Sequence, residues 1–511
     1  MNMIIKICFL LVFFALMLGV GLYSRRRAAS VNSFVLGGRS IGPWMSAFSY
    51  GTSYFSAVVF VGYAGQFGFR YGIASTWIGL GNALIGSLLA WVILGRRTRV
   101  MSKHLESATM PDFFGKRYDS RALKLVASAI VFVFLVPYTA SIYNGLSRLF
   151  EMAFGIPYLY CVIGMALLTA VYVVLGGLMA TAITDFIQGI IMLVGIVLIV
   201  GAVLQSNGGF MQALAALSAI PSEAPATLGQ QGAYASFFGA DPQSLLGVVI
   251  LTSLGTWGLP QMVHKFYTIK SEKAVYTGTI VSSLFALLIS GGCYFLGGFS
   301  RLYSDSVLRD AAGNVAYDSI IPGMLASLGD VLIAITLMLV LSASMSTLAS
   351  LVLSSSSTLC LDFLRGNLIK NMSEKAQLLW LRGLVLVFIL ISVLLALDPP
   401  TFIAQLMGIS WGALAGAFLA PFLYGLYWKG MNRLGVWASF LTGVGITLGN
   451  LFLGISSPIN AGAVAMLASL IVAPIASLLG KKLDSALVEN IFSCYDEKVL
   501  VSRKYHLRRE E

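Results

Sequence analysis

Apolar runs of about 20 residues recur from the start of the chain to beyond residue 470. A run of about this length crosses the roughly 30 Å of hydrocarbon in a bilayer. Backbone N–H and C=O groups find no water there, so each run is expected to form a helix. The composition agrees, because 58% of the residues are hydrophobic, 11% are charged and the mean hydropathy is +0.86. The sequence therefore predicts an all-α polytopic membrane protein.

About thirteen transmembrane helices are expected, joined by short loops. They cover residues 4–23, 42–67, 73–95, 122–149, 157–178, 183–204, 243–264, 275–299, 319–358, 378–397, 401–427, 432–453 and 459–480. The loops between them leave no room for a soluble domain. Residues 1–480 are therefore expected to form a single transmembrane domain, followed by a cytoplasmic tail over residues 481–511.

Lysine and arginine are distributed unevenly between alternate loops. With the N-terminus outside, 28 of the 33 basic residues fall on the cytoplasmic side, which is the side that retains positive charge. This assignment puts Lys265 in a cytoplasmic loop and leaves no lysine or arginine at the depth of a midplane pocket. We expect a multi-pass protein of the plasma or inner membrane with its C-terminus in the cytoplasm. The net charge of +12 then reflects membrane insertion and anionic lipid, and no nucleic-acid partner is expected.

Motifs for catalysis are absent from the sequence. It contains no HExxH, GxSxG or P-loop lysine motif, and its five cysteines are widely scattered. We therefore expect no enzyme, no catalytic residues and no thiolate metal site.

A ladder of small hydroxyl residues lies inside one of the apolar runs. Ala343, Ser346, Thr347 and Ser350 recur at steps of three and four, which places them on one face of a helix. In hydrocarbon their hydroxyls need partners. They can bind a hard cation if a second backbone supplies carbonyl oxygens, or they can bond back to their own helix and let helices pack closely. The ladder alone leaves both interpretations open.

Two of the expected spans carry signs of a break. Residues 42–67 contain a cluster of glycine, serine and threonine around Gly51, and residues 243–264 contain Gly255 and Pro260. Interrupted spans in corresponding positions are typical of inverted-repeat transporters, whose unwound backbone meets ions and solute. Each break taken alone is also explained by a packing kink.

One acid stands out near the start of a long apolar run. Asp185 is the only carboxylate between Glu151 and Glu223. An acid in this place either caps its helix through amide contacts or belongs to an ion pathway within the membrane. The residue alone does not decide between the two.

Three motifs together resemble the sodium/solute symporter family, with the proline symporter-like branch nearest in layout. They are Thr181–Gln188 following Gly176-Gly177-Leu178, the ladder segment Ala343–Leu348, and Gly72–Ile78. The resemblance extends from Gly37-Gly38-Arg39 to the eleventh span. It implies a LeuT-like fold of five plus five helices with discontinuous second and seventh spans. Residues 42–204 would form the first repeat and 243–427 the inverted second repeat, with 1–23 and 432–480 peripheral.

The resemblance also implies a sodium site. Its ligands would be the carbonyl oxygens of Thr52, Phe55 and Ala343 and the hydroxyl oxygens of Ser346 and Thr347. Some members resemble a two-sodium design in which Asp185 joins hydroxyls at positions 346, 349 and 350. Position 349 is alanine in this chain. We therefore expect one sodium ion per cycle, and we interpret Asp185 and Ser350 as a second sodium site or an ion-exit route.

The breaks and the repeat geometry predict a solute pocket at the midplane. Its expected residues are Ser53, Tyr54, Ser56, Ala57, Trp77, Tyr143, Ser253, Thr256, Trp257 and Gln261. The proline transporters carry an acid where this chain has Tyr54, which argues against proline itself. An amino acid, a monocarboxylate, a vitamin-like acid and a neutral sugar all remain open.

The expected function is sodium-coupled import of a small organic solute by alternating access. Its partners would be the solute, sodium and the lipid bilayer, with no obligate protein partner. The alternative is a membrane-embedded solute sensor that keeps the transporter fold, although the tail after Lys482 is too short for a signalling domain. A channel fits an occluded midplane site less well.

Overall fold

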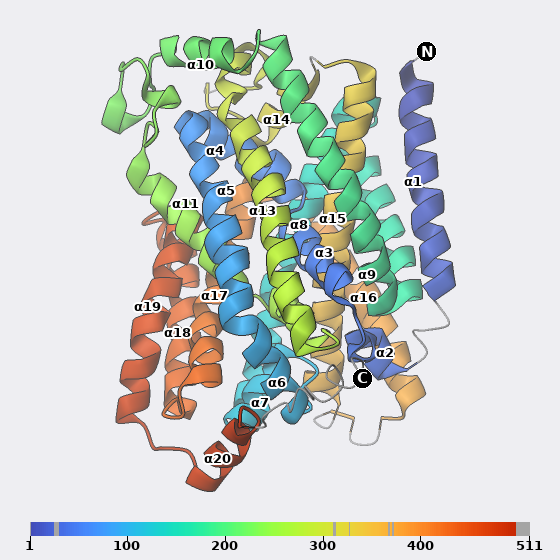
Figure 1. Ribbon diagram of the computed structural model, residues 1–511, viewed down its shortest axis with the longest axis vertical. Helices are drawn as coiled ribbons and strands as arrows, with labels where there is room; N and C mark the ends of the chain where they lie inside the picture. The colour runs from blue at the N-terminus through green and yellow to red at the C-terminus, as the bar shows by residue number, and fades with distance from the viewer. Residues whose placement is uncertain are drawn as a thin grey trace, which may run out of the picture.

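Helices account for the regular structure of the chain. The computed structural model describes residues 2–24, 30–309, 313–326, 328–365, 368–369 and 372–496. Among these residues β-structure is limited to isolated bridges, and ten helices are long and apolar enough to cross a membrane. Figure 1 shows the long helices running side by side along the long axis of the molecule. The all-α prediction is confirmed, whereas the count of thirteen spans stays a prediction.

The helices fall into a long and a short class. The long ones are α1 (Asn2–Ser24), α8 (Arg121–Phe154), α9 (Tyr158–Ser206), α13 (Glu272–Gly298), α15 (Asp330–Ser357), α16 (Glu374–Leu397), α17 (Ile403–Tyr427), α18 (Arg433–Leu453) and α19 (Pro458–Leu479). The shorter ones are α2 (Val31–Leu36), α3 (Pro43–Tyr54), α4 (Ala64–Tyr71), α5 (Thr76–Gly81), α6 (Arg96–His104), α7 (Met110–Arg117), α10 (Phe210–Ala219), α11 (Pro242–Leu254), α12 (Pro260–Tyr267), α14 (Ile320–Ala326) and α20 (Ser485–Ser493). Gly177, with φ of 53° and ψ of −165°, divides α9 into two arms.

The second span is broken where the sequence predicts it. Helix α3 ends at Tyr54, Phe55 is extended, and the chain resumes in the π-helical turn η3 (Val58–Tyr63) before α4. The Ser56 hydroxyl accepts a hydrogen bond from the Val58 amide over 3.2 Å, which caps the new start. The break therefore leaves backbone groups near Phe55 outside any continuous helix.

The seventh span is broken in a similar way. Helix α11 passes into the single 3-10 turn η9 (Gly255–Trp257), and α12 then starts at Pro260. Proline suits a first helical turn because it has no N–H to leave unpaired there. The predicted discontinuity of both spans is confirmed.

The expected start of the ninth span at residue 319 is wrong. The short helix α14 covers Ile320–Ala326, and α15 begins only at Asp330, after the extended residue Gly329. The side chains of Ile320 and Ile321 are fully buried in the protein. Their apolar character reflects packing against protein rather than lipid, which made the segment look like part of the span.

The broken helices lie inside the bundle. Helix α3 packs against α9, α13 and α15, and α15 also packs against α8. Helices α18 and α19 pack on each other and on α17 at one edge, while α1 lies at the other edge against α9 and α15 (Figure 1). Any ion or solute site formed by α3 and α15 is therefore enclosed by protein.

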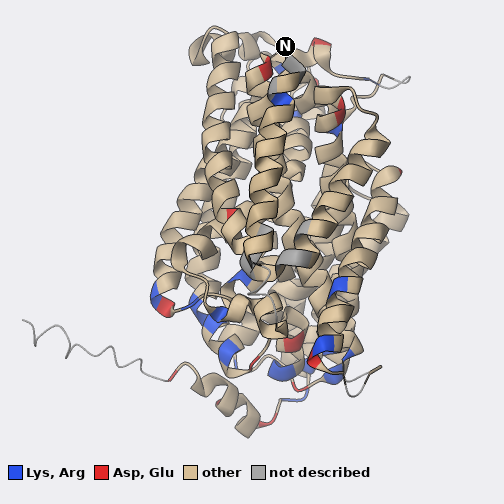
Figure 2. Ribbon diagram, turned by 90° about the vertical axis from the view of Figure 1, so that its right-hand side faces the viewer, with Lys and Arg blue, Asp and Glu red and all other residues tan. Residues whose placement is uncertain are grey.

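Charged side chains gather at the ends of the bundle. Figure 2 shows most lysines and arginines at the end opposite the N-terminus, near α20. The described part of the predicted tail, residues 481–496, contains helix α20, and residues 497–511 lie outside the described residues.

Candidate ion and solute site

The hydroxyl ladder of α15 faces the end of α3. The Ser346 hydroxyl donates to the carbonyl oxygens of Thr52 and Ala343, each over 2.9 Å. The Thr347 hydroxyl lies 3.3 Å from the Thr52 carbonyl, 3.4 Å from that of Ser53 and 3.0 Å from that of Ala343. Two hydroxyls and three carbonyls, from segments almost 300 residues apart, therefore converge within the core.

Two further residues with candidate oxygen ligands lie at the end of α3. Phe55, the fifth expected sodium ligand, is buried in the extended stretch that follows α3. The Thr52 hydroxyl is buried and has no hydrogen-bond partner among the described residues. The Ala57 amide donates to the Ser344 hydroxyl over 3.1 Å, so the far side of the break also rests on α15. The break is held against the ladder on both sides.

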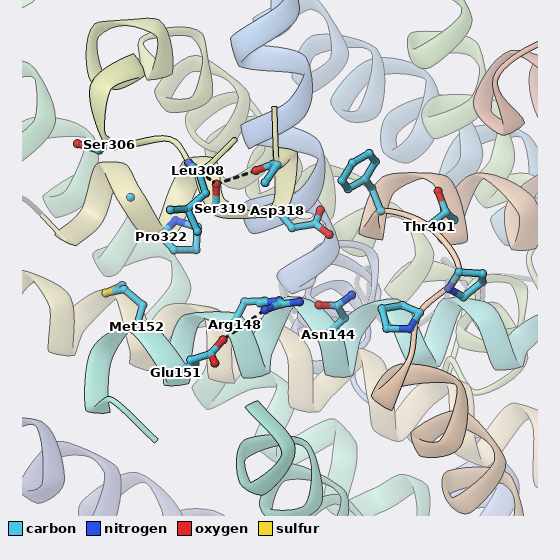
Figure 3. Close-up of a pocket in the computed structure, with 15 residues that line it drawn as sticks. Asn144, Arg148, Glu151, Met152, Ser306, Leu308, Asp318, Ser319, Pro322 and Thr401 are labelled. Atoms are coloured by element: carbon cyan, nitrogen blue, oxygen red, sulfur yellow. Dashed lines mark hydrogen bonds and ion pairs between the residues drawn. The ribbon is translucent and has the colours of Figure 1, made fainter. Parts of the chain in front are cut away.

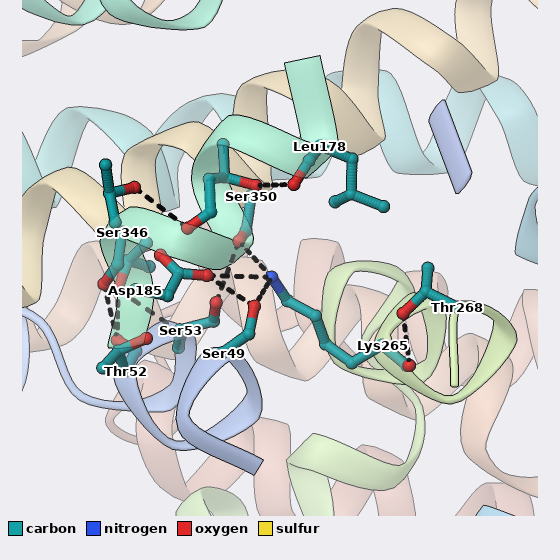
Figure 4. A network of polar contacts seen from close by, with 12 residues as sticks. Ser49, Thr52, Ser53, Leu178, Asp185, Lys265, Thr268, Ser346 and Ser350 are labelled. Atoms are coloured by element: carbon teal, nitrogen blue, oxygen red, sulfur yellow. Dashed lines mark hydrogen bonds and ion pairs between the residues drawn. The ribbon is translucent and has the colours of Figure 1, made fainter. Parts of the chain in front are cut away.

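A lysine lies beside this oxygen cluster. Lys265 on α12 is only 3% exposed, and its Nζ donates to the hydroxyls of Ser49 over 2.8 Å and Ser350 over 2.9 Å. The same Nζ lies 3.7 Å from Oδ2 of Asp185, whose side chain is fully buried on α9. Figure 4 shows the four side chains pointing toward one another from α3, α9, α12 and α15.

Hydroxyl groups close this network. The Ser49 hydroxyl donates to Asp185 Oδ2 over 2.5 Å, and a 2.9 Å hydrogen bond joins the hydroxyls of Ser53 and Ser350. Asp185 and Ser350, predicted together as a second sodium site or an ion-exit route, both lie next to the Lys265 Nζ. The assignment of Lys265 to a cytoplasmic loop is wrong, because the residue lies within α12 and inside the protein. Ser49 and Lys265 were both missed by sequence reasoning.

Several expected solute residues converge on the π-helical segment η5 (Asn82–Leu89). The Thr256 hydroxyl donates to the Gly86 carbonyl and the Trp257 indole to the Ile85 carbonyl, each over 3.0 Å. The Ser253 hydroxyl donates to Oδ1 of Asn82 over 3.3 Å. The break in the seventh span is therefore anchored on the third span.

The remaining predicted solute residues divide into three groups. Ser53, Tyr54, Ser56 and Ala57 line the α3 break and are buried. Tyr143 on α8 and Gln261 on α12 are buried as well, and each has one side-chain oxygen without a hydrogen-bond partner among the described residues. Trp77 lies elsewhere, because it is 38% exposed and donates to the Phe237 carbonyl over 2.9 Å. Its predicted place in the midplane pocket is wrong, because its ring packs on Phe237 in the loop before α11.

A large cavity lies apart from these residues. It has a volume of about 770 Å³ and is lined by segments around Arg148 and Glu151 of α8, the turn at Asp318, and the loop before α17. Figure 3 shows Arg148, Glu151 and Asn144 on one wall and Asp318 and Ser319 on the other. None of the predicted solute residues lines it. Burial raises the pKa of Asp318 to about 6.

Comparison with known proteins identifies the family. The model of the sodium:solute symporter family matches residues 34–443. The chain belongs to the sodium:solute symporter family. As a member, it is a multi-pass membrane protein that carries a small organic solute together with sodium as the coupling ion. The site described above lies within the matched region.

Curated relatives of this symporter carry proline in their names. It is 30% identical over 452 residues to the osmoregulated proline transporter OpuE of Bacillus subtilis, covering 86% of this chain and 87% of the relative. It is 29% identical over 453 residues to the sodium/proline symporter 2 of Staphylococcus saprophyticus, covering 85% and 83%. These relatives are transporters rather than enzymes.

Solved structures show the fold of this symporter. A substrate-bound, outward-open Na+-coupled sialic acid symporter aligns with a TM-score of 0.75 at 19% identity, over 94% of this chain and 99% of the other. Mhp1, a nucleobase-cation-symport-1 family transporter, aligns with a TM-score of 0.54 at 14% identity, over 90% and 97%. The LeuT-like fold class is confirmed, while the bounds of the two repeats stay a prediction.

Proposed function

We propose that this symporter imports a small amino acid or related carboxylate with sodium bound between α3 and α15. The sodium ligands would be the carbonyl oxygens of Thr52, Phe55 and Ala343 and the hydroxyl oxygens of Ser346 and Thr347. One observation carries the proposal: Ser346 and Thr347 both lie within hydrogen-bonding distance of the Thr52 and Ala343 carbonyls.

The chemistry of these groups suits sodium. Hard cations prefer oxygen ligands, and neutral carbonyl and hydroxyl oxygens can replace a hydration shell without a formal charge. In the structure the two hydroxyls of the ladder donate to the carbonyls. A bound cation would be met by the same oxygens once each hydroxyl proton rotates away from its carbonyl.

The α3 break links the ion to the solute. Thr52 contributes to the proposed sodium site, and Tyr54, two residues later, contributes to the proposed solute pocket. An ion that joins α3 to α15 therefore also fixes the backbone that presents the solute residues. Such binding favours one gate state only if the two helices separate in the other state, which is the differential affinity that coupling requires.

The solute class is supported by the relatives and by the broken helices. The named relatives transport proline, and a span interrupted at Phe55 is typical of the backbone that meets solute in inverted-repeat transporters. Tyr54 stands where the proline transporters carry an acid. We therefore include proline among the candidate amino acids but do not propose it as the preferred solute.

The proposed orientation has the N-terminus outside and the C-terminus in the cytoplasm. It is supported by the gathering of lysine and arginine at the end of the bundle that carries α20 (Figure 2).

Uptake by proteoliposomes tests the proposal. Labelled amino acids, monocarboxylates and sugars are presented in parallel with an inward sodium gradient or an equal potassium gradient. We expect at least one small amino acid or carboxylate to accumulate only with sodium. Equal accumulation of every solute in the two salts would contradict sodium coupling, and accumulation of sugars alone would contradict the solute class.

A further inference from the structure

The Lys265 ammonium is surrounded by oxygen atoms that could otherwise bind a second cation. Its donors meet the hydroxyl oxygens of Ser49 and Ser350 at 2.8 and 2.9 Å, with the Asp185 carboxylate 3.7 Å away. Carboxylate and hydroxyl oxygens are the ligands that a second alkali cation would use. The side chain of Lys265 is 3% exposed and that of Asp185 is fully buried. Water therefore does not solvate either charge.

The two charges neutralise each other within the core. A buried carboxylate without a counter-charge is strongly unfavourable, and here a covalently attached ammonium supplies that charge. A sodium ion added to the same oxygens would bring a second positive charge beside Lys265. Ala349, one residue before Ser350, is buried and offers no side-chain oxygen, so a cation in this place would rely on Asp185, Ser49 and Ser350.

We propose that Lys265 is a resident cation that fills the second ion site, so that the symporter binds one sodium ion rather than two. This inference rests on the proposed function, in which the one sodium lies between α3 and α15. Lys265 thereby holds α12, α3, α9 and α15 together by a charge that never leaves the protein.

The resident cation is connected to the proposed sodium site. Ser350 lies one helical turn after Ser346 on α15, and Ser53 follows Thr52 on α3. The 2.9 Å hydrogen bond between Ser53 and Ser350 joins the two places. Separation of α3 from α15 would break this bond and the contacts of Lys265 together, so the lysine would respond to the same gate movement as sodium.

Binding of radiolabelled sodium to the purified symporter, without solute, tests the inference. We expect one sodium ion per wild-type protein and two per Lys265→Ala protein, because Asp185, Ser49 and Ser350 would then be free to take an ion. The double variant Lys265→Ala with Asp185→Asn should return to one. Two ions in the wild type, or one ion in folded Lys265→Ala protein, would overturn the proposal.

A further variant keeps the test decisive if Lys265→Ala protein does not fold. Ser346→Ala with Thr347→Ala should lower wild-type binding from one ion to none. A remaining ion that is lost when Asp185→Asn is added would show sodium at the lysine site and overturn the inference. A single ion that survives both changes would contradict the proposed sodium site instead, and the wild-type stoichiometry of one would still agree with a resident cation.

Discussion

The Tyr54 hydroxyl on α3 donates a 2.6 Å hydrogen bond to the carbonyl oxygen of Thr252 on α11. The two residues are 198 positions apart, and each lies within a few residues of a helix break. The Tyr54 ring also stacks on Phe55, with ring centroids 4.4 Å apart. One side chain therefore links the two broken spans that are expected to enclose the solute.

Tyr54→Phe should weaken solute transport while leaving the fold intact. The change removes one hydrogen bond but keeps the ring and its stacking. A net loss of roughly 1 kcal/mol corresponds to about a fivefold increase in KM for the solute. Initial uptake rates over a range of solute concentrations measure it. Tyr54→Asp restores the acid of the proline transporters, and an unchanged solute preference in that variant would show that Tyr54 does not face the pocket.

Trp257→Phe and Trp77→Phe form a matched pair. The Trp257 indole donates to the Ile85 carbonyl across the break, whereas the Trp77 indole donates to the Phe237 carbonyl in the loop before α11. We expect Trp257→Phe to raise KM by about fivefold, from one lost hydrogen bond of roughly 1 kcal/mol, and Trp77→Phe to leave KM within about twofold. The reverse order of effects would place the solute near Phe237 and the loop before α11.

Asp318 should make stability depend on pH. Both carboxylate oxygens lie 3.3 Å from the Ile403 amide at the start of α17, and burial raises the pKa to about 6. Between about pH 4 and 6 the Asp318 carboxyl is protonated in the folded protein and ionised in the unfolded chain. Stability relative to Asp318→Asn should be highest below this window, fall as pH rises through it and stay constant above it.

Thermal unfolding of the detergent-solubilised protein measures this dependence. We expect the Tm difference between wild type and Asp318→Asn to shift in favour of the wild type by about 1 °C from about pH 7.5 to pH 5, because roughly 1.4 kcal/mol acts against the large unfolding entropy of a 511-residue chain. A difference that does not change with pH would show that Asp318 keeps its ordinary pKa.

The helices α4 and α13 should tolerate no side chain at Gly297. A Cβ there would overlap the backbone carbonyl of Ala64, while a Cβ on Gly291 of the same helix meets nothing within 4 Å. Gly297→Ala should cost at least roughly 1 to 3 kcal/mol through overpacking, and Gly291→Ala should be neutral or stabilising. Equal Tm values for the two variants would show that the helices can move apart without cost.

The sequence predicts which residues form the site better than it predicts which residues lie next to them in the fold. Ser346 and Thr347 could be found because hydroxyls in hydrocarbon need partners and because their spacing puts them on one helix face. The break near Phe55 could be found because glycine, serine and threonine replace aliphatic residues at that depth. Both signals are local, so one sequence is enough to read them.

Lys265 could not be placed from local signals. It lies just before Lys270 and Lys273, so the distribution of basic residues assigns it to a cytoplasmic loop. Its real position follows from a pairing with Asp185, 80 residues away, which only the fold brings about. A usable signal did exist, because an acid within a span requires a counter-charge and Lys265 adjoins an expected span. The prediction for Trp77 is wrong for a related reason. Its position is set by a contact with Phe237, 160 residues away, which only the fold brings about.

The sodium dependence of uptake by Ser346→Ala with Thr347→Ala protein tests the central claim most directly. Ser356→Ala is the control, because Ser356 is a buried hydroxyl of the same helix that bonds only back to the Val352 carbonyl among the described contacts. Loss of two ligand oxygens should raise the half-saturating sodium concentration at least about tenfold, which corresponds to roughly 1.4 kcal/mol, with Ser356→Ala unchanged. An unchanged sodium dependence in the double variant would contradict a sodium site between α3 and α15.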